Sequence, residues 1–210
     1  MEFLNTLLQN TITMMAIVDP LGVGAIMLSL LPNDASNDDV KKIAKKTTLT
    51  IIIAFFVVLI FGNLVLKLFG IEIDSLKVMG GIVLLLTGIK MVNGAIEQKN
   101  HTKEERDEVK THEDFSIIPL GIPITFGPGI FATIIILKGH SHTIWEIVSL
   151  IISFLIVAIA TYLALKNSIY LKKYLGITGQ KIISRLMGLI VGAIAVQFIL
   201  SGSLALIKSY

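Results

Sequence analysis

The 210-residue sequence has no cysteine and little charge, and each shortage excludes a class of protein. Without cysteine there is no disulfide framework, no thiolate metal site and no cysteine nucleophile. Charged residues make up 16% of the chain and apolar residues 54%, whereas soluble domains carry about 25% charged residues. The mean hydropathy is +0.82. This composition excludes a water-soluble domain, and it also excludes a disordered, charge-rich chain.

Several chemical motifs are also missing from the sequence. There is no P-loop, so the chain is not expected to drive a process by its own ATP hydrolysis. No set of nucleophile, base and orienting group is recognisable, and His140 and His142 alone make a poor metal site. The net charge of +3 is too small to indicate a nucleic-acid partner. We therefore expect no enzyme, no resident metal and no cofactor.

Six stretches are apolar and long enough to cross a bilayer, which requires about 20 residues. Backbone groups in hydrocarbon must be hydrogen-bonded internally, and continuous apolar runs without alternation favour helices over a closed barrel. We therefore predict an all-α membrane protein with six transmembrane helices. They lie at residues 3–31, 47–66, 75–93, 115–137, 147–165 and 186–207.

Lysine and arginine are unevenly distributed over the connections between these spans. Fourteen fall in or at the edges of the first, third and fifth connections, and four fall on the opposite side. Because cytoplasmic loops retain positive charge, we predict that the odd-numbered connections are cytoplasmic and that both termini lie outside. Trp145 is then placed at the outer interface, where indole side chains are common.

The two halves of the chain resemble each other at an offset of 108 residues. Three anchors share this offset: Pro20 with Pro128, Gly94 with Gly202, and residues 77–80 with 185–188. We predict two three-helix units, at residues 1–96 and 115–210, joined by a solvated cytoplasmic linker at 97–114. Because three is an odd number, the second unit enters the membrane from the opposite side. Such inverted repeats are typical of secondary transporters.

Four of the five prolines fall in two glycine-rich segments, at residues 18–24 and 118–129. Proline removes a backbone donor and clashes with the preceding turn, and glycine costs about 1 kcal/mol inside a helix. In a bilayer, freed backbone groups are tolerated only where they are buried in protein or line a wet cavity. We therefore predict two discontinuous helices around a hydrated cavity. The alternative is that these residues only kink packed helices.

Two such breaks offer matching groups for a small zwitterion. The N–H groups of a restarting helix suit a carboxylate, and the carbonyls that end the preceding helix suit an ammonium group or a cation. Glycine leaves room for a small ligand, so glycine, alanine or serine fits best. The predicted substrate-binding residues border the two breaks or lie mid-span: Asp19, Pro20, Leu21, Gly22, Thr125, Phe126, Gly127, Pro128, Gly129 and Gln197.

Asp19 is the one carboxylate inside a predicted hydrocarbon core. A carboxylate at that depth costs at least ~2.5 kcal/mol, so it pairs, binds a cation or takes up a proton. We predict that Asp19 couples transport to Na⁺ or H⁺. The alternative is that it caps the restarting helix, which is a common role for aspartate, and both roles are compatible.

Three motifs resemble those of the MarC family, a UPF0056-type group of inner-membrane proteins classed with the LysE-type exporters. They are Asp19-Pro20-x-Gly22, Pro119-Leu120-x-x-Pro123-x-x-x-Gly127-Pro128-Gly129, and residues 184–188 together with 196–199. The resemblance implies six spans with periplasmic termini and a role in transport. One branch of the family is described as carrying small neutral amino acids.

From these observations we expect a secondary transporter of small neutral amino acids in the inner membrane. Its surroundings are the lipid bilayer, and its substrate is a small zwitterion. Self-association into a homo-oligomer is left open. Two other functions also remain open at this point, an ion or small-solute channel and a structural or regulatory membrane protein.

Overall fold

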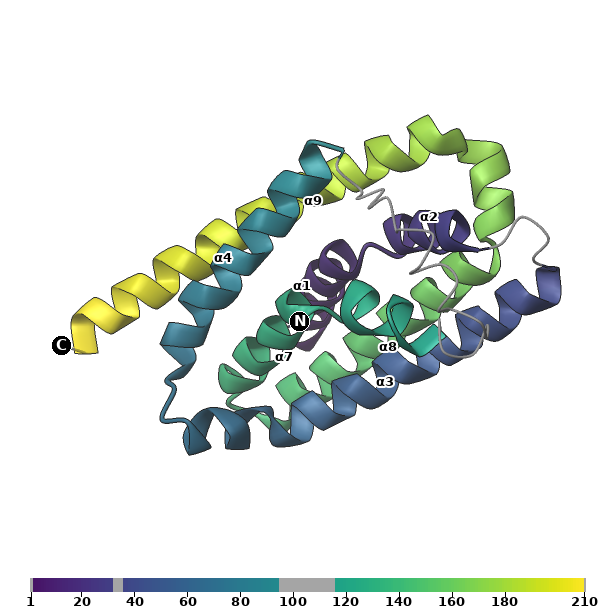
Figure 1. The fold of residues 1–210 in the computed structure, drawn as a ribbon. Helices are drawn as coiled ribbons and strands as arrows, with labels where there is room; N and C mark the ends of the chain where they lie inside the picture. Colours follow the sequence, from purple (N-terminus) through teal and green to yellow (C-terminus); the bar gives the residue numbers. More distant parts are fainter. Residues whose placement is uncertain (1, 32–35, 95–115, 210) are drawn as a thin grey trace.

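The computed structural model describes residues 2–31, 36–94 and 116–209, which form an assembly of helices (Figure 1). No strand occurs in these ranges. The predicted linker at 97–114 lies outside the described residues. The elements in chain order are α1 (Glu2–Val18), α2 (Pro20–Leu30), α3 (Asn37–Leu68), α4 (Ile73–Val92), η1 (Leu120–Thr125), α7 (Pro128–Gly139), α8 (Ile144–Lys166) and α9 (Ser168–Ser209).

Five segments among the described residues are long and apolar enough to cross a membrane: Glu2–Leu30, Asn37–Leu68, Ile73–Val92, Ile144–Lys166 and Thr178–Ser209. Each overlaps one predicted span. The remaining predicted span, 115–137, is divided between the π-helical turn η1 and the 12-residue helix α7. Twelve helical residues cover about 18 Å, less than the hydrocarbon core, so α7 alone does not cross it. The all-helical membrane fold is confirmed, and the sixth span and the inverted repeat remain predictions.

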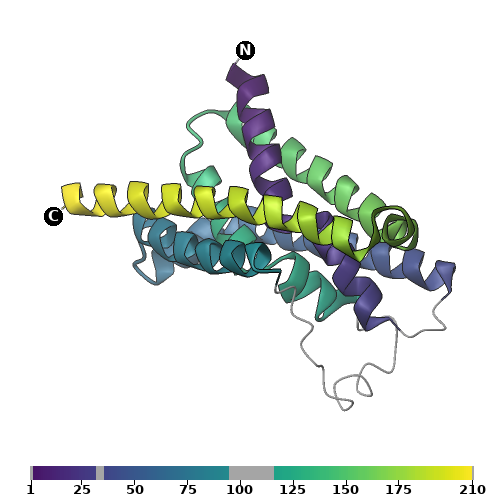
Figure 2. The ribbon, with the colours of Figure 1, turned by 90° about the horizontal axis from the view of Figure 1, so that it is seen from above.

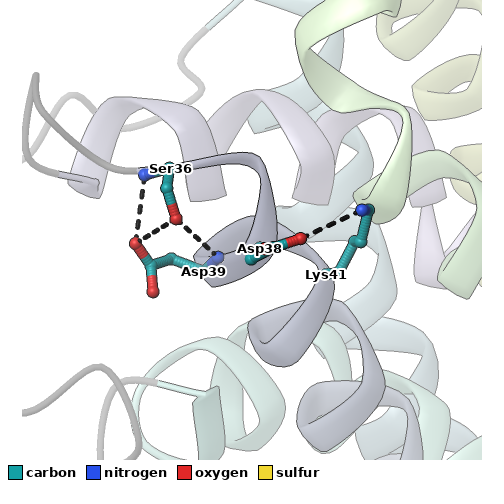
Figure 3. A network of polar contacts seen from close by, with 4 residues as sticks. All are labelled: Ser36, Asp38, Asp39 and Lys41. Atoms are coloured by element: carbon teal, nitrogen blue, oxygen red, sulfur yellow. Dashed lines mark hydrogen bonds and ion pairs between the residues drawn. The ribbon is translucent and has the colours of Figure 1, made fainter.

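Two helices extend beyond the predicted spans into the lysine-rich connections. Helix α3 begins ten residues before its apolar run because Ser36 and Asp39 form a reciprocal cap (Figure 3). Asp39 N donates to Ser36 Oγ at 3.2 Å, and Ser36 N donates to Asp39 Oδ2 at 3.0 Å. Helix α9 already begins at Ser168 and bends at Gly176, whose φ of 63° is a left-handed conformation that glycine adopts freely. Apolar runs therefore locate the part of a helix in lipid and miss its charged turns.

Three apolar clusters hold the helices together. The largest joins α1, α3, α7 and α8, and at its centre the rings of Phe55 and Phe154 stack at 4.0 Å. The second joins α2, α3, η1 and α8, and the third joins α1, α4 and α9. The segments on both sides of each predicted break are therefore packed into the interior.

Helices α4 and α9 lie side by side in both views (Figures 1 and 2). Glycines allow their backbones to approach closely. A methyl group on Gly88 would lie 2.8 Å from the carbonyl oxygen of Gly188 and 2.9 Å from the nitrogen of Gly192. A methyl group on Gly81 would lie 2.8 Å from the carbonyl oxygen of Ala195. This contact is typical of helix pairs in membranes, where small residues form the interface.

The outer faces of the helices carry many large apolar side chains. Examples from α1, α3, α4 and α9 are Leu8, Ile12, Ile53, Ile60, Leu86, Leu189 and Leu200, all exposed. A protein in water rarely exposes apolar surface this extensive. The distribution suits a chain whose outer surface contacts lipid.

Candidate functional site at two helix breaks

The first break separates α1 from α2 at a single residue, Asp19. Its backbone has φ 44° and ψ 68°, and it is the one non-glycine residue with positive φ in the described ranges. Aspartate enters this left-handed region more readily than most residues. Pro20 then occupies the first position of α2, where its missing N–H leaves no gap in the hydrogen bonding. The sequence Asp-Pro therefore ends one helix and starts the next.

The Asp19 carboxylate bonds to groups on two different helices. Its Oδ1 accepts from the backbone N–H of Gly22 at 3.2 Å, and its Oδ2 accepts from the hydroxyl of Ser184 on α9 at 2.6 Å. The alternative role of Asp19, capping of α2, is confirmed. A carboxylate has about four lone-pair positions, so these two bonds leave acceptor capacity for another ligand. Coupling to an ion stays a prediction.

Gly22 makes room for this carboxylate. A methyl group on Gly22 would lie 2.8 Å from Asp19 Cγ, closer still to Oδ2, and 3.1 Å from Ser184 Oγ. Gly24 on the same helix differs, because a methyl group there would make ordinary contacts of 3.6 Å with the Ala164 carbonyl oxygen and 3.7 Å with Ser168 Cβ. The absence of a side chain at Gly22 is therefore a specific requirement of the Asp19–Ser184 contact.

The second break lies between η1 and α7. Within η1 the backbone of Ile122 is extended, with φ −131° and ψ 125°. Gly127 is also extended, with φ −89° and ψ 179°, and Pro128 takes the first position of α7. The two offset-matched prolines thus hold the same position in their restarting helices. Unlike α2, α7 has no side-chain cap, since Gly127 stands where Asp19 would be.

The structure brings the two breaks together. Val18 and Phe126, each adjacent to a break residue, belong to one buried cluster. Val23 of α2 shares a second cluster with Leu120 of η1. A methyl group on Gly129 would lie 3.8 Å from Cγ2 of Ile17 in α1. The predicted discontinuities therefore pack against each other, with apolar side chains between them.

The remaining predicted site residues differ in where they lie. Pro20 is buried and Leu21 half-buried beside the first break. Thr125 is buried, and its hydroxyl donates to the Leu120 carbonyl at 2.7 Å within η1. Gln197 is exposed on α9, about 20 Å along the helix from Ser184, so the structure does not bring it to the first break.

Ser184 is the contact that the sequence analysis missed. It is buried on α9 and lies 165 residues from Asp19 in the chain, so no local pattern connects the two. Its place at the start of the 184–188 motif is the one signal that could have drawn attention to it.

Comparison with known proteins tests the suggested family. The family model described as "MarC family integral membrane protein" matches residues 4–207. The chain belongs to the MarC family. No solved structure matches the chain significantly.

Relatives in the MarC family come from distant organisms. The UPF0056 membrane protein YvbG of Bacillus subtilis is 34% identical, and the match covers 91% of this chain and 90% of YvbG. A UPF0056 membrane protein of Methanocaldococcus jannaschii is 32% identical over 89% of this chain and 90% of its own length. One from Aquifex aeolicus is 29% identical over 94% and 92%. The similarity therefore extends over nearly the whole chain.

Proposed function

We propose that this MarC-family protein is a secondary transporter of small neutral amino acids across the inner membrane. The observation that carries the proposal is the pair of interrupted helices packed together, one of them bearing a carboxylate with spare acceptor capacity. Secondary transporters bind substrates and coupling ions at such discontinuous helices. An uninterrupted bundle would offer no unpaired backbone groups at this depth.

The two breaks differ in charge, which orients the proposed substrate. Asp19 already caps α2, so a second carboxylate there would meet a negative charge. The start of α7 has no side-chain cap and suits the substrate carboxylate. The substrate ammonium and the coupling ion then lie on the Asp19 side. Glycine, alanine and serine are small enough to fit between backbone segments of this kind.

Uptake of radiolabelled glycine into proteoliposomes tests the transport function. With an imposed Na⁺ or H⁺ gradient, we expect glycine to accumulate above its external concentration. A channel only equilibrates the solute, so uptake that stops at equal concentrations contradicts the proposal. Failure to bind or move any small zwitterion would contradict it as well.

Replacement of Asp19 by asparagine is expected to remove the ion dependence of uptake while leaving the fold intact. Asparagine is an equally good helix cap and also tolerates left-handed backbone, so the break keeps its shape. The charge that would hold a cation or proton is lost. Asp38→Asn, at an exposed position on α3, is the matched control and keeps wild-type behaviour. If Asp19→Asn retains the wild-type ion dependence, Asp19 does not couple transport.

We further propose that both termini lie on the outer side of the membrane. Two pairs of contacts support the grouping of helix ends that this orientation requires. The rings of Phe3 and Trp145 are nearly perpendicular with their centroids 6.4 Å apart, so the start of α1 lies beside the start of α8. A methyl group on Gly202 would lie 2.7 Å from the Asp74 carbonyl, so the end of α9 lies beside the start of α4. These are the ends that the charge distribution assigns to the outside.

Cysteine labelling in intact cells checks the orientation, since the native chain has no cysteine to interfere. A membrane-impermeant maleimide added outside is expected to label Lys208→Cys and His142→Cys but not Lys41→Cys. After the cells are opened, all three should react. Labelling of Lys41→Cys alone in intact cells would reverse the proposed orientation.

A further inference from the structure

Helix α9 carries a polar side chain in the middle of its membrane span. Gln197 lies near the centre of residues 186–207, which contain no charge and are bounded by Arg185 and Lys208. It is therefore about 17 Å from each charged boundary. The Gln197 side chain is exposed. An amide without hydrogen-bond partners in hydrocarbon costs several kcal/mol, so its exposure requires an explanation.

None of the helices in the described residues covers this amide. Helix α4 packs on the opposite face of α9, where a methyl on Gly81 would meet Ala195 and Ile199. At 100° per residue, Gln197 is turned roughly 160–200° away from these two residues. Helix α1 packs against α9 at Val191 and Ala195, which lie on a different face from Gln197. In the described part of the chain, Gln197 has no hydrogen-bond partner.

The face around Gln197 has the composition of a helix–helix interface. Ala193 and Ser201, one turn before and one turn after it, are small and exposed. Leu189, Val196 and Leu200 flank this stripe and are exposed too. Small residues allow two helix backbones to approach, and a polar residue among them forms interhelical hydrogen bonds. Within the span Thr178–Ser209, the apolar 18-residue stretch is 17% buried, the smallest share among the five candidate spans.

We propose that a second copy of this chain covers the face formed by Ala193, Gln197 and Ser201, giving a two-fold symmetric dimer. A glutamine amide is both donor and acceptor, so the amide N–H of Gln197 in each copy donates to the amide oxygen of Gln197 in the other. Two chains inserted in the same orientation place their α9 helices parallel, so the same residues meet. Lipid tails cannot replace this partner, because hydrocarbon has no hydrogen-bond donor or acceptor. This assignment does not depend on what the protein transports.

Disulfide cross-linking in membranes tests the interface directly. The native chain lacks cysteine, so Ala193→Cys and Ser201→Cys each introduce one thiol and keep Gln197. Mild oxidation is expected to give a covalent dimer with each. Ile53→Cys and Ile60→Cys, on the exposed face of α3, are matched controls and should stay monomeric. Equal cross-linking at α3, a product with another protein, or no product at α9 overturns the proposal.

Association in liposomes tests the role of the amide. Gln197→Leu is expected to raise the dimer dissociation constant about three- to tenfold, measured by energy transfer between labelled chains at several protein-to-lipid ratios. Gln197→Asn keeps a donor and an acceptor and should retain most of the association. Unchanged or tighter association of Gln197→Leu overturns the proposal. Thermal unfolding of each variant in detergent confirms that the monomer itself is intact.

Discussion

Replacing Gly22 by alanine is expected to lower the free energy of unfolding by about 1–3 kcal/mol and to abolish glycine uptake. The new methyl would overlap the Asp19 carboxylate and crowd the Ser184 hydroxyl. Either the carboxylate leaves its cap on α2, or α9 moves away from the break. Both changes disrupt the geometry on which the proposed ion site depends.

Gly24→Ala is the matched control for this prediction. It adds the same methyl to the same helix, but its nearest neighbours would lie at 3.6 Å or beyond. Because alanine is favoured over glycine inside a helix, this variant should be unchanged or stabilised by up to about 1 kcal/mol. Chemical unfolding in detergent gives the two free energies, and the liposome assay gives uptake. Equal effects at the two positions would show that the Asp19–Ser184 contact has no special requirement for glycine.

Gly88→Ala is expected to destabilise the protein by about 2 kcal/mol or more by separating α4 from α9. The atoms that its methyl would meet belong to the backbone of Gly188 and Gly192, which cannot rotate away as a side chain can. Part of the apolar contact around Leu84, Val191 and Ala195 would then be lost.

Gly192→Ala supplies the comparison on the facing helix. A methyl there meets nothing within 4 Å, so the helix preference of alanine should leave stability unchanged or slightly higher. Thermal unfolding of both variants in the same detergent measures the difference. A Gly88→Ala protein as stable as wild type would mean that the two helices adjust their separation at little cost.

The sequence was most informative where local chemistry decides the structure. Proline suits a helix start because its φ is fixed and it has no N–H. The positions of Pro20 and Pro128 in the sequence therefore mark the starts of α2 and α7. The five long spans follow from the length of apolar runs. Asp19 stood out because a carboxylate is rare in such a run.

Other features depend on contacts that no local pattern contains. The Ser184 hydroxyl meets Asp19 only because α9 folds back across the α1–α2 junction. Gln197 was assigned to the substrate pocket for its polarity, whereas the face on which it lies depends on how α4 and α1 pack against α9.

The Ser184 hydroxyl has a consequence for how the first and last helices stay connected. A hydroxyl both donates and accepts, so it can donate to an ionised Asp19 or accept from a protonated one. Gain or loss of a proton at Asp19 therefore reverses the direction of this hydrogen bond without breaking it. The contact between α9 and the α1–α2 junction therefore does not require Asp19 to be ionised.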